Sequence, residues 1–86
     1  MRIPKEVKIK SVNFKVSLED LGDDLFGNYG ENPPIIRINN KAPEDYKEMT
    51  LIHEILHILR GGMKENEVRE LAWDLWAVLF KENKLI

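Results

Sequence analysis

The amino-acid sequence predicts a small α+β domain, with a three- to four-stranded, mostly antiparallel sheet packed on two C-terminal helices in the order β-β-β-β-α-α. Two observations lead to this prediction. Residues 6–39 contain short apolar runs with a period of two, separated by turn residues, whereas residues 44–60 and 65–82 have helical periodicity. Because the chain has 86 residues, we expect one domain that spans residues 1–86.

The first half of the chain supplies the strands. Residues 6–18 alternate apolar and polar side chains, and the alternation slips at 11–13, which predicts a hairpin turn or a bulge. Residues 25–29 form a second, shorter candidate strand. Residues 31–34 have the chemistry of a turn, and the β-branched run at 35–39 predicts another strand. The pattern does not determine the order of these strands in the sheet.

The second half of the chain supplies two helices. Pro43, followed by two acidic residues, suits the first turn of a helix that runs to Arg60, where Gly61-Gly62 provides the C-cap. A second helix starts at residues 64–65 and runs to about Glu82, with its apolar side chains on one face. The short connection predicts that the two helices are antiparallel neighbours.

Composition argues against several classes of function. A net charge of −2 provides no basic surface for nucleic acid and no polybasic patch for a membrane. No apolar stretch is long enough to span a bilayer, and the first residues lack the hydrophobic region of a signal peptide. The chain has no cysteine, which removes disulfides and thiolate metal sites and is compatible with a reducing cytoplasm. We therefore expect a cytoplasmic protein with no nucleic-acid or membrane partner.

The two histidines of the chain lie four residues apart in the sequence His53-Glu54-Ile55-Leu56-His57. On a helix, residues i and i+4 lie on one face, so both imidazoles can bind one metal ion with Glu54 beside them. Two His ligands and a Glu that acts as base to a zinc-bound water form the site of many zinc peptidases. We therefore predict Zn²⁺ bound by His53 and His57, with Glu54 as the catalytic base. The structural alternatives are two histidines on a solvated face, or two core histidines bonded to backbone carbonyls.

A catalytic zinc site needs a third protein ligand. Because the chain has no other histidine and no cysteine, this ligand must be a carboxylate, and Glu65, Glu67, Glu70 and Asp74 of the second helix are the candidates. Counting the helical rise outward from the connection puts the two histidines roughly level with residues 68–70. Glu67 borders the apolar face at about this height. We therefore choose Glu67 as the third ligand, with Glu65 and Glu70 as alternatives.

With these features, the chain resembles the small gluzincin-type zinc metallopeptidases of phages and prophages, near the ImmA/IrrE-like family. The resemblance rests on Thr50-Leu51-Ile52-His53-Glu54-Ile55-Leu56-His57, together with the strand at 35–39 before it and the helical segment 67–72 after it. The similarity in layout runs from about Val7 to Asn83.

The resemblance implies a minimal zincin-like fold, in which a short twisted sheet packs over the motif helix. It also implies a zinc site. His53 and His57 would be ligands, Glu54 the general base, and the third ligand one of Glu65 and Glu67.

The predicted activity is that of a zinc-dependent metalloendopeptidase acting on a peptide or protein substrate. An extended substrate would lie against an edge strand, and the strands at 35–39 and 25–29 are both candidates for that edge. A developing oxyanion needs a donor besides zinc, which Tyr29, Tyr46 or Arg60 could supply.

The alternative is a non-catalytic, degenerate zincin-like domain that acts as a protein-interaction module. We expect Trp73 and Trp76 to belong to the core or to an interface rather than to a substrate platform. A homodimer could complete a cleft that 86 residues build only in part.

Overall fold

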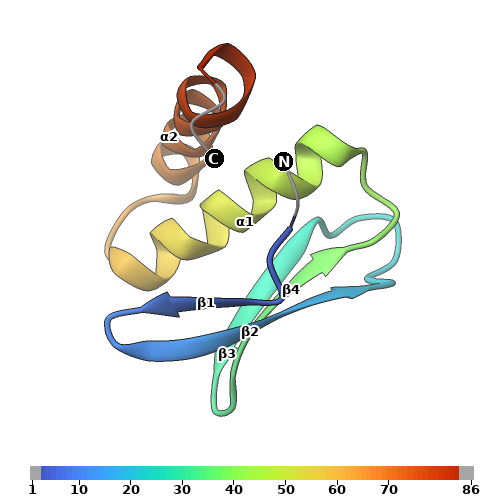
Figure 1. Ribbon diagram of the computed structural model, residues 1–86, viewed down its shortest axis with the longest axis vertical. Helices are drawn as coiled ribbons and strands as arrows, with labels where there is room; N and C mark the ends of the chain where they lie inside the picture. The colour runs from blue at the N-terminus through green and yellow to red at the C-terminus, as the bar shows by residue number, and fades with distance from the viewer. Residues whose placement is uncertain (1–2, 84–86) are drawn as a thin grey trace.

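The computed structural model describes residues 3–83, which form four strands followed by helices (Figure 1). The strands are β1 (Glu6–Ile9), β2 (Val12–Glu19), β3 (Gly27–Glu31) and β4 (Pro34–Asn39). The helices are α1 (Glu44–Leu59) and α2 (Glu65–Trp76), and α2 continues into a π-helical segment, η1 (Ala77–Glu82). The predicted α+β class and the order β-β-β-β-α-α are confirmed.

The four strands form one mixed sheet in the order β1-β2-β4-β3. The β1–β2 and β3–β4 pairs are antiparallel, as expected, whereas β2 and β4 run parallel. The parallel pair arises from the path of the chain. After β2, the chain passes over to the edge of the sheet and forms β3, and it then turns back to form β4 between β2 and β3. β4 is therefore an interior strand, and Ile36 and Ile38 on it are 0% exposed. The edge strand on this side of the sheet is β3.

The predicted irregularity after the first strand is a tight hairpin turn. Lys10 and Ser11 have φ values of 52° and 66°, which fit a two-residue turn of the type that matches strand twist. The turn lies slightly earlier than residues 11–13, since Val12 and Asn13 already pair with β1. It lets Phe14 and Val16 point to the core while Lys15 between them faces solvent.

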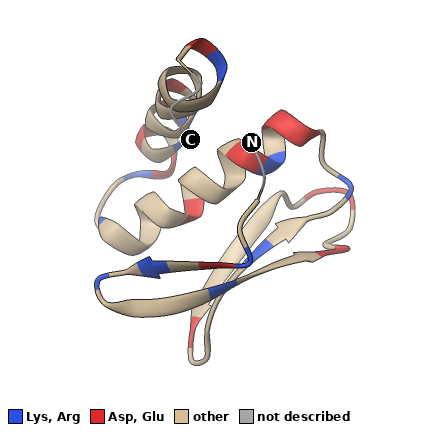
Figure 2. Cartoon of the chain, in the orientation of Figure 1, with Lys and Arg blue, Asp and Glu red and all other residues tan. Residues whose placement is uncertain are grey.

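Helix α1 lies between the sheet and α2, so the molecule has three layers (Figure 1). One core cluster joins α1 to the sheet and contains Ile36, Ile38 and Leu51, and a second joins α1 to α2 and η1 and contains Met49, Ile52 and Phe80. Figure 2 shows that most of α1 carries no charged residue beyond its first turns. Burial on two sides accounts for the apolar character of this helix.

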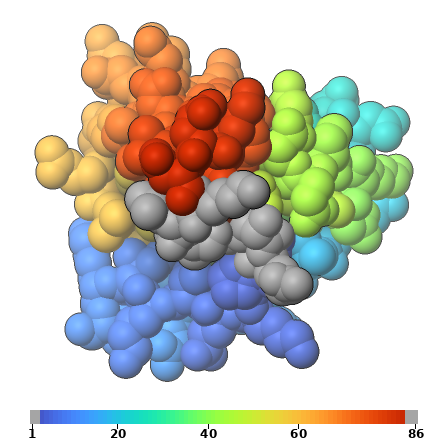
Figure 3. All heavy atoms as spheres, turned by 45° about the horizontal axis from the view of Figure 1, so that its top comes forward, coloured from blue at the N-terminus to red at the C-terminus, as the bar shows by residue number. Residues whose placement is uncertain are grey.

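The two helices run antiparallel, as predicted. Glu65 at the start of α2 contacts His57 near the end of α1, and the Trp76 indole Nε1 donates a 2.9 Å hydrogen bond to Glu48 Oε1. Figure 3 shows the C-terminal helix lying beside the start of α1, with the β1–β2 hairpin below. Trp76 packs against the second core cluster, as expected for a core residue. Within residues 3–83, no helix is long and apolar enough to cross a lipid bilayer.

Asn39, at the end of β4, fixes the loop that leads into β3. Its side chain is buried, and its amide nitrogen donates hydrogen bonds of 2.8 Å to the carbonyl oxygens of Gly22 and Leu25. Its amide oxygen accepts a bond from the backbone N–H of Lys41 at 3.1 Å. These bonds satisfy backbone groups that a loop would otherwise leave unpaired, and they hold β3 in place beside α1.

Candidate metal centre

One stripe of α1 carries polar side chains that line a cleft, although Thr50 among them is only 2% exposed. Tyr46, Thr50, His53 and His57 recur at intervals of four, three and four residues, which places them on one face of the helix. All four line a cleft bounded by α1, the start of α2, and β3 with the loop before it. The apolar positions of α1 face the two cores, so the HExxH motif is directed into this cleft.

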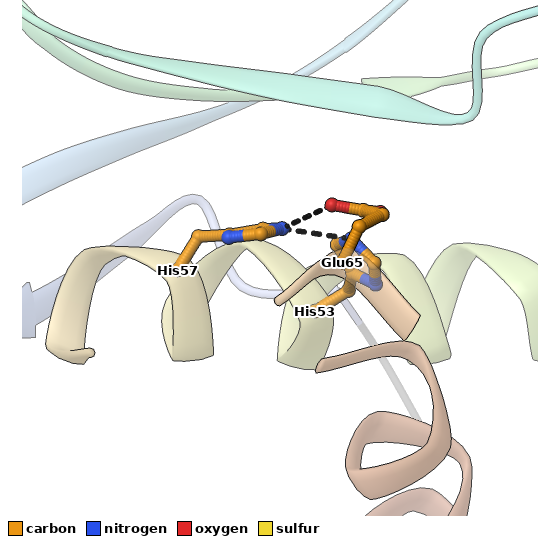
Figure 4. A group of neighbouring side chains, drawn as sticks. All are labelled: His53, His57 and Glu65. Atoms are coloured by element: carbon orange, nitrogen blue, oxygen red, sulfur yellow. Dashed lines mark hydrogen bonds and ion pairs between the residues drawn. The ribbon is translucent and has the colours of Figure 1, made fainter. Parts of the chain in front are cut away.

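The side chains of His53, His57 and Glu65 converge in the cleft (Figure 4). The two imidazole Nε2 atoms are 3.1 Å apart, and the Glu65 carboxylate lies 2.9 Å from His53 Nε2 and 2.8 Å from His57 Nε2. Ligand atoms of a tetrahedral zinc site are separated by about 3.3 Å, given Zn–N distances near 2.0 Å. The two contacts of the carboxylate use different oxygens, Oε1 toward His53 and Oε2 toward His57. The two nitrogens and the carboxylate have the chemistry of a zinc donor set, and one ligand atom from each residue lies within 4.8 Å of the others.

Among the candidate third ligands, Glu65 is the one that joins the histidines. Glu67, our first choice, does not. Its Oε1 accepts a 3.1 Å hydrogen bond from the backbone N–H of Lys64 and so caps the start of α2. Val68 and Ala72, both 0% exposed, mark the face of α2 that packs on α1, and Glu65 is on that same face, three and seven residues earlier.

The helical face of Glu65 is therefore the signal in the sequence that identifies it, whereas height along the helix favours Glu67. The long Glu65 side chain spans the difference in height between its backbone and the histidines. Glu67 is at a better height, but its position on another face of α2 directs its side chain away from them. Glu70 and Asp74 are exposed and lie outside the group of three, and among the described residues only His53, His57 and Glu65 form such a group.

Burial favours the ligand form of His53. Its side chain is 12% exposed, and loss of hydration lowers its pKa, an effect that the nearby Glu65 carboxylate partly opposes. For Glu65, partial burial acts to raise the pKa, but the charges of His53 and His57 and their hydrogen bonds to the carboxylate together outweigh it, and the net pKa is lowered. A neutral imidazole and an ionised carboxylate are the forms that bind a metal ion.

Glu54 lies beside the donor set and is only 7% exposed. Burial raises the pKa of its carboxyl to about 7; the His57 charge opposes this shift and the Glu65 charge adds to it. A carboxyl group with a pKa near neutrality can both accept and return a proton at physiological pH. The position of Glu54, next to the histidines and lining the same cleft, suits the role of base that the motif predicts.

The cleft has a volume of about 680 Å³, within the size range of ligand sites. Tyr29 and Tyr46, two of the candidate oxyanion donors, line it, whereas Arg60 ends α1 outside it. Arg69 is not among the site residues predicted from the sequence, but it lines the cleft and lies 3.9 Å from the Glu65 carboxylate. Helical periodicity gives the signal for Arg69, because it is four residues after Glu65.

Gly27 allows β3 to approach α1 closely. A Cβ atom at Gly27 would lie 2.5 Å from the Thr50 methyl and 2.7 Å from the Arg37 carbonyl oxygen, and 3.7 Å from the Glu54 carboxylate. No residue with a side chain fits there without moving the strand or the helix. In the sequence, Gly27 merely interrupts a short strand pattern, and its role depends on a contact between segments over twenty residues apart.

We expect Gly27→Ala to destabilise the protein by about 1–3 kcal/mol, because the added methyl overpacks the contact between β3 and α1. Gly30→Ala is the matched control, since a Cβ there meets nothing closer than 3.7 Å and lies on the same strand. Urea denaturation of both variants measures the difference. Equal stabilities for the two variants would contradict the close approach.

In metal-free protein, kept so with a chelator, Glu54→Gln should change the pH dependence of stability. A raised carboxyl pKa means that the folded state disfavours the charged form, so wild-type stability falls as pH rises from the unfolded-state value of 4.5 to about 7. The variant has no carboxyl at this position and so lacks this loss. The free energy of unfolding of the variant minus that of wild type should therefore be up to about 3 kcal/mol larger at pH 8 than at pH 4. Denaturation at the two pH values gives the result, and a pH-independent difference would refute the shift.

Comparisons with protein-family models, with curated proteins and with solved structures find no match for this chain. The resemblance to gluzincin-type peptidases therefore stays a prediction.

Proposed function

We propose that this protein is a zinc-dependent metallopeptidase. The observation that carries the proposal is the convergence of His53, His57 and Glu65 within hydrogen-bonding distance of one another, with Glu54 buried beside them. Three protein ligands of this kind leave a fourth zinc position open, as catalytic sites require. We assign the activity to the cytoplasm, because a chain without cysteine suits a reducing compartment.

The substrate would bind as an extended peptide along the free edge of β3. The backbone N–H of Asn39 donates a 2.7 Å bond to the carbonyl of Phe26, and Gly27 is opposite Ile38. Because hydrogen-bonded pairs alternate along an antiparallel ladder, Gly27 and Tyr29 direct their N–H and C=O groups away from β4. Both residues line the cleft. This topology favours β3 as the substrate edge and argues against residues 35–39, which lie in the interior strand.

The residues of the chain divide the chemistry between them. A zinc ion held by the His53, His57 and Glu65 side chains would supply Lewis acidity toward a carbonyl and a water molecule. The Glu54 carboxylate takes the proton from the attacking water and returns it to the leaving amine. Tyr29, which lines the cleft, is the candidate for a hydroxyl that donates to the developing oxyanion. Tyr46 also lines the cleft but lies two helical turns before His53, too far along α1 for this role.

A second candidate function is a non-catalytic interaction module. The contacts of 2.8 Å and 2.9 Å between Glu65 and the histidines are also those of ordinary hydrogen bonds, which can tie α2 to α1 without a metal ion. The buried Glu54 favours the peptidase, because burying a carboxylate is costly and a structural tie between the helices has no need of it.

Zinc titration tests the donor set. We expect about one zinc per chain. Affinity should fall at least 10-fold in His57→Ala and in Glu65→Gln, because each removes a ligand. Glu67→Gln is the matched control: it alters the cap of the same helix turn and should leave zinc affinity unchanged. Competition with a chromogenic chelator measures these affinities, and loss of affinity in Glu67→Gln but not in Glu65→Gln would reverse the assignment.

Cleavage of a peptide library by the zinc-loaded protein tests the activity. Glu54→Gln should keep its zinc and lose at least about 100-fold in kcat/KM, since it lacks the base but has nearly the same shape. Products are identified by mass spectrometry. A wild-type protein that binds zinc and cleaves no member of the library would favour the interaction module.

A further inference from the structure

Three aromatic side chains form a continuous wall on one side of the cleft. The ring centroids of Phe26 and Tyr46 are 5.2 Å apart, and those of Tyr46 and Trp73 are 5.0 Å apart with an edge-to-face geometry. The rings come from the loop before β3, from the first turn of α1 and from α2. We call Phe26, Tyr46 and Trp73 the aromatic wall.

The aromatic wall remains accessible from the cleft. Phe26 is 49% exposed and Tyr46 is 36% exposed, and all three rings line the cleft that also contains His53 and His57. Trp73 continues inward to Trp76, with 5.5 Å between ring centroids, and both pack against the second core cluster. The wall is therefore anchored at one end and open at the other, as expected of a preformed apolar subsite.

Helix geometry gives the distance from the aromatic wall to the metal centre. Tyr46 is seven residues before His53 on the same face of α1, which corresponds to about 10 Å along the helix axis. An extended peptide advances about 3.3 Å per residue, so this distance spans about three residues. Phe26 directly precedes Gly27, so the wall begins where the free edge of β3 begins.

We propose that the aromatic wall is a specificity subsite that binds a bulky apolar side chain, preferably aromatic, of an extended peptide lying along β3. That side chain would be about three residues from the cleaved bond. The inference rests on the proposed function for the position of the cut, but the binding preference itself requires no catalysis.

A peptide suits this site better than a second copy of the chain. A stable interface between folded copies buries about 800 Å² on each partner and needs a broad surface. The aromatic wall is instead one side of a concave site of about 680 Å³, with the unpaired backbone groups of Gly27 and Tyr29 beside it. A strand that pairs with those groups would bring its side chains to the wall.

Peptide binding to the cleavage-deficient, zinc-loaded Glu54→Gln protein tests the proposal. The probes are dye-labelled, capped heptapeptides of alanine and serine, with a single phenylalanine placed at each position in turn, and a parent peptide without it. Fluorescence anisotropy should show that the best phenylalanine peptide binds about 10-fold or more tightly than the parent. With active protein, products should carry phenylalanine about three residues from the cut.

Variants of the aromatic wall are compared with a matched surface change. Phe26→Ser and, as a second variant, Tyr46→Ser should abolish the phenylalanine preference. Leu18→Ser is the control, because Leu18 is also 49% exposed and lies outside the cleft lining. Thermal melts show which variants are folded.

Three results would overturn the proposal: no phenylalanine preference, a preference retained in both folded wall variants, or a dimer in sedimentation that Phe26→Ser dissociates. The last would assign the wall to a second copy of the chain. Failure of the proposed function is separate, since it appears as absent cleavage by the wild-type protein whether or not phenylalanine peptides bind.

Discussion

The burial of α1 on two sides is the constraint on which the rest of the structure depends. The sheet covers one side and α2 with η1 covers the other, so nearly every position on this helix is committed to packing. Beyond the first turn of α1, its polar side chains either have a partner in another layer, as Glu48 has in Trp76, or lie on the one stripe that lines the cleft. That remaining stripe is the one that carries the two histidines, and the small size of the chain is what brings the open stripe and both cores into contact with a single helix.

The cleft is bounded where the edge strand β3 approaches α1, and Gly27 is the residue that allows this close approach. Gly27 brings the backbone of β3 into contact with Thr50 and close to Glu54, while Asn39 holds the preceding loop by its carbonyl oxygens. The strand edge proposed to bind substrate and the carboxyl proposed as the base are therefore positioned by the same contact. The low dielectric that this contact creates around Glu54 also sets its proton affinity, so packing and chemistry share one cause.

Much of this arrangement was predictable from the sequence, and the exceptions have physical reasons. Apolar runs with a period of two and an apolar helical segment predict the α+β class and the order of strands and helices along the chain. The spacing of His53 and His57 predicts that both lie on one polar stripe of α1. The parallel pairing of β2 with β4 was not predictable, because alternation reports which face a residue occupies and says nothing of its neighbours. Height along the helix predicts Glu67, but the direction of a side chain depends on its helical face, and Glu65 is on the face that packs on α1. Gly27 gains its role only from a contact between distant segments, whereas Arg69 lines the cleft because it lies one helical turn after Glu65.

The contacts of Glu65 on α2 with His53 and His57 on α1 have a consequence for thermodynamic linkage. The donor atoms belong to both helices, so an ion bound there would act as a cross-link across the connection at residues 60–64 and stabilise the docked position of α2, by about 2.7 kcal/mol at 100-fold excess over Kd. Linkage is reciprocal, so whatever loosens α2 also weakens ion binding. By this reasoning the hydrogen bond from Trp76 to Glu48, at the far end of the same helix pair, would contribute to the affinity for such an ion without touching it.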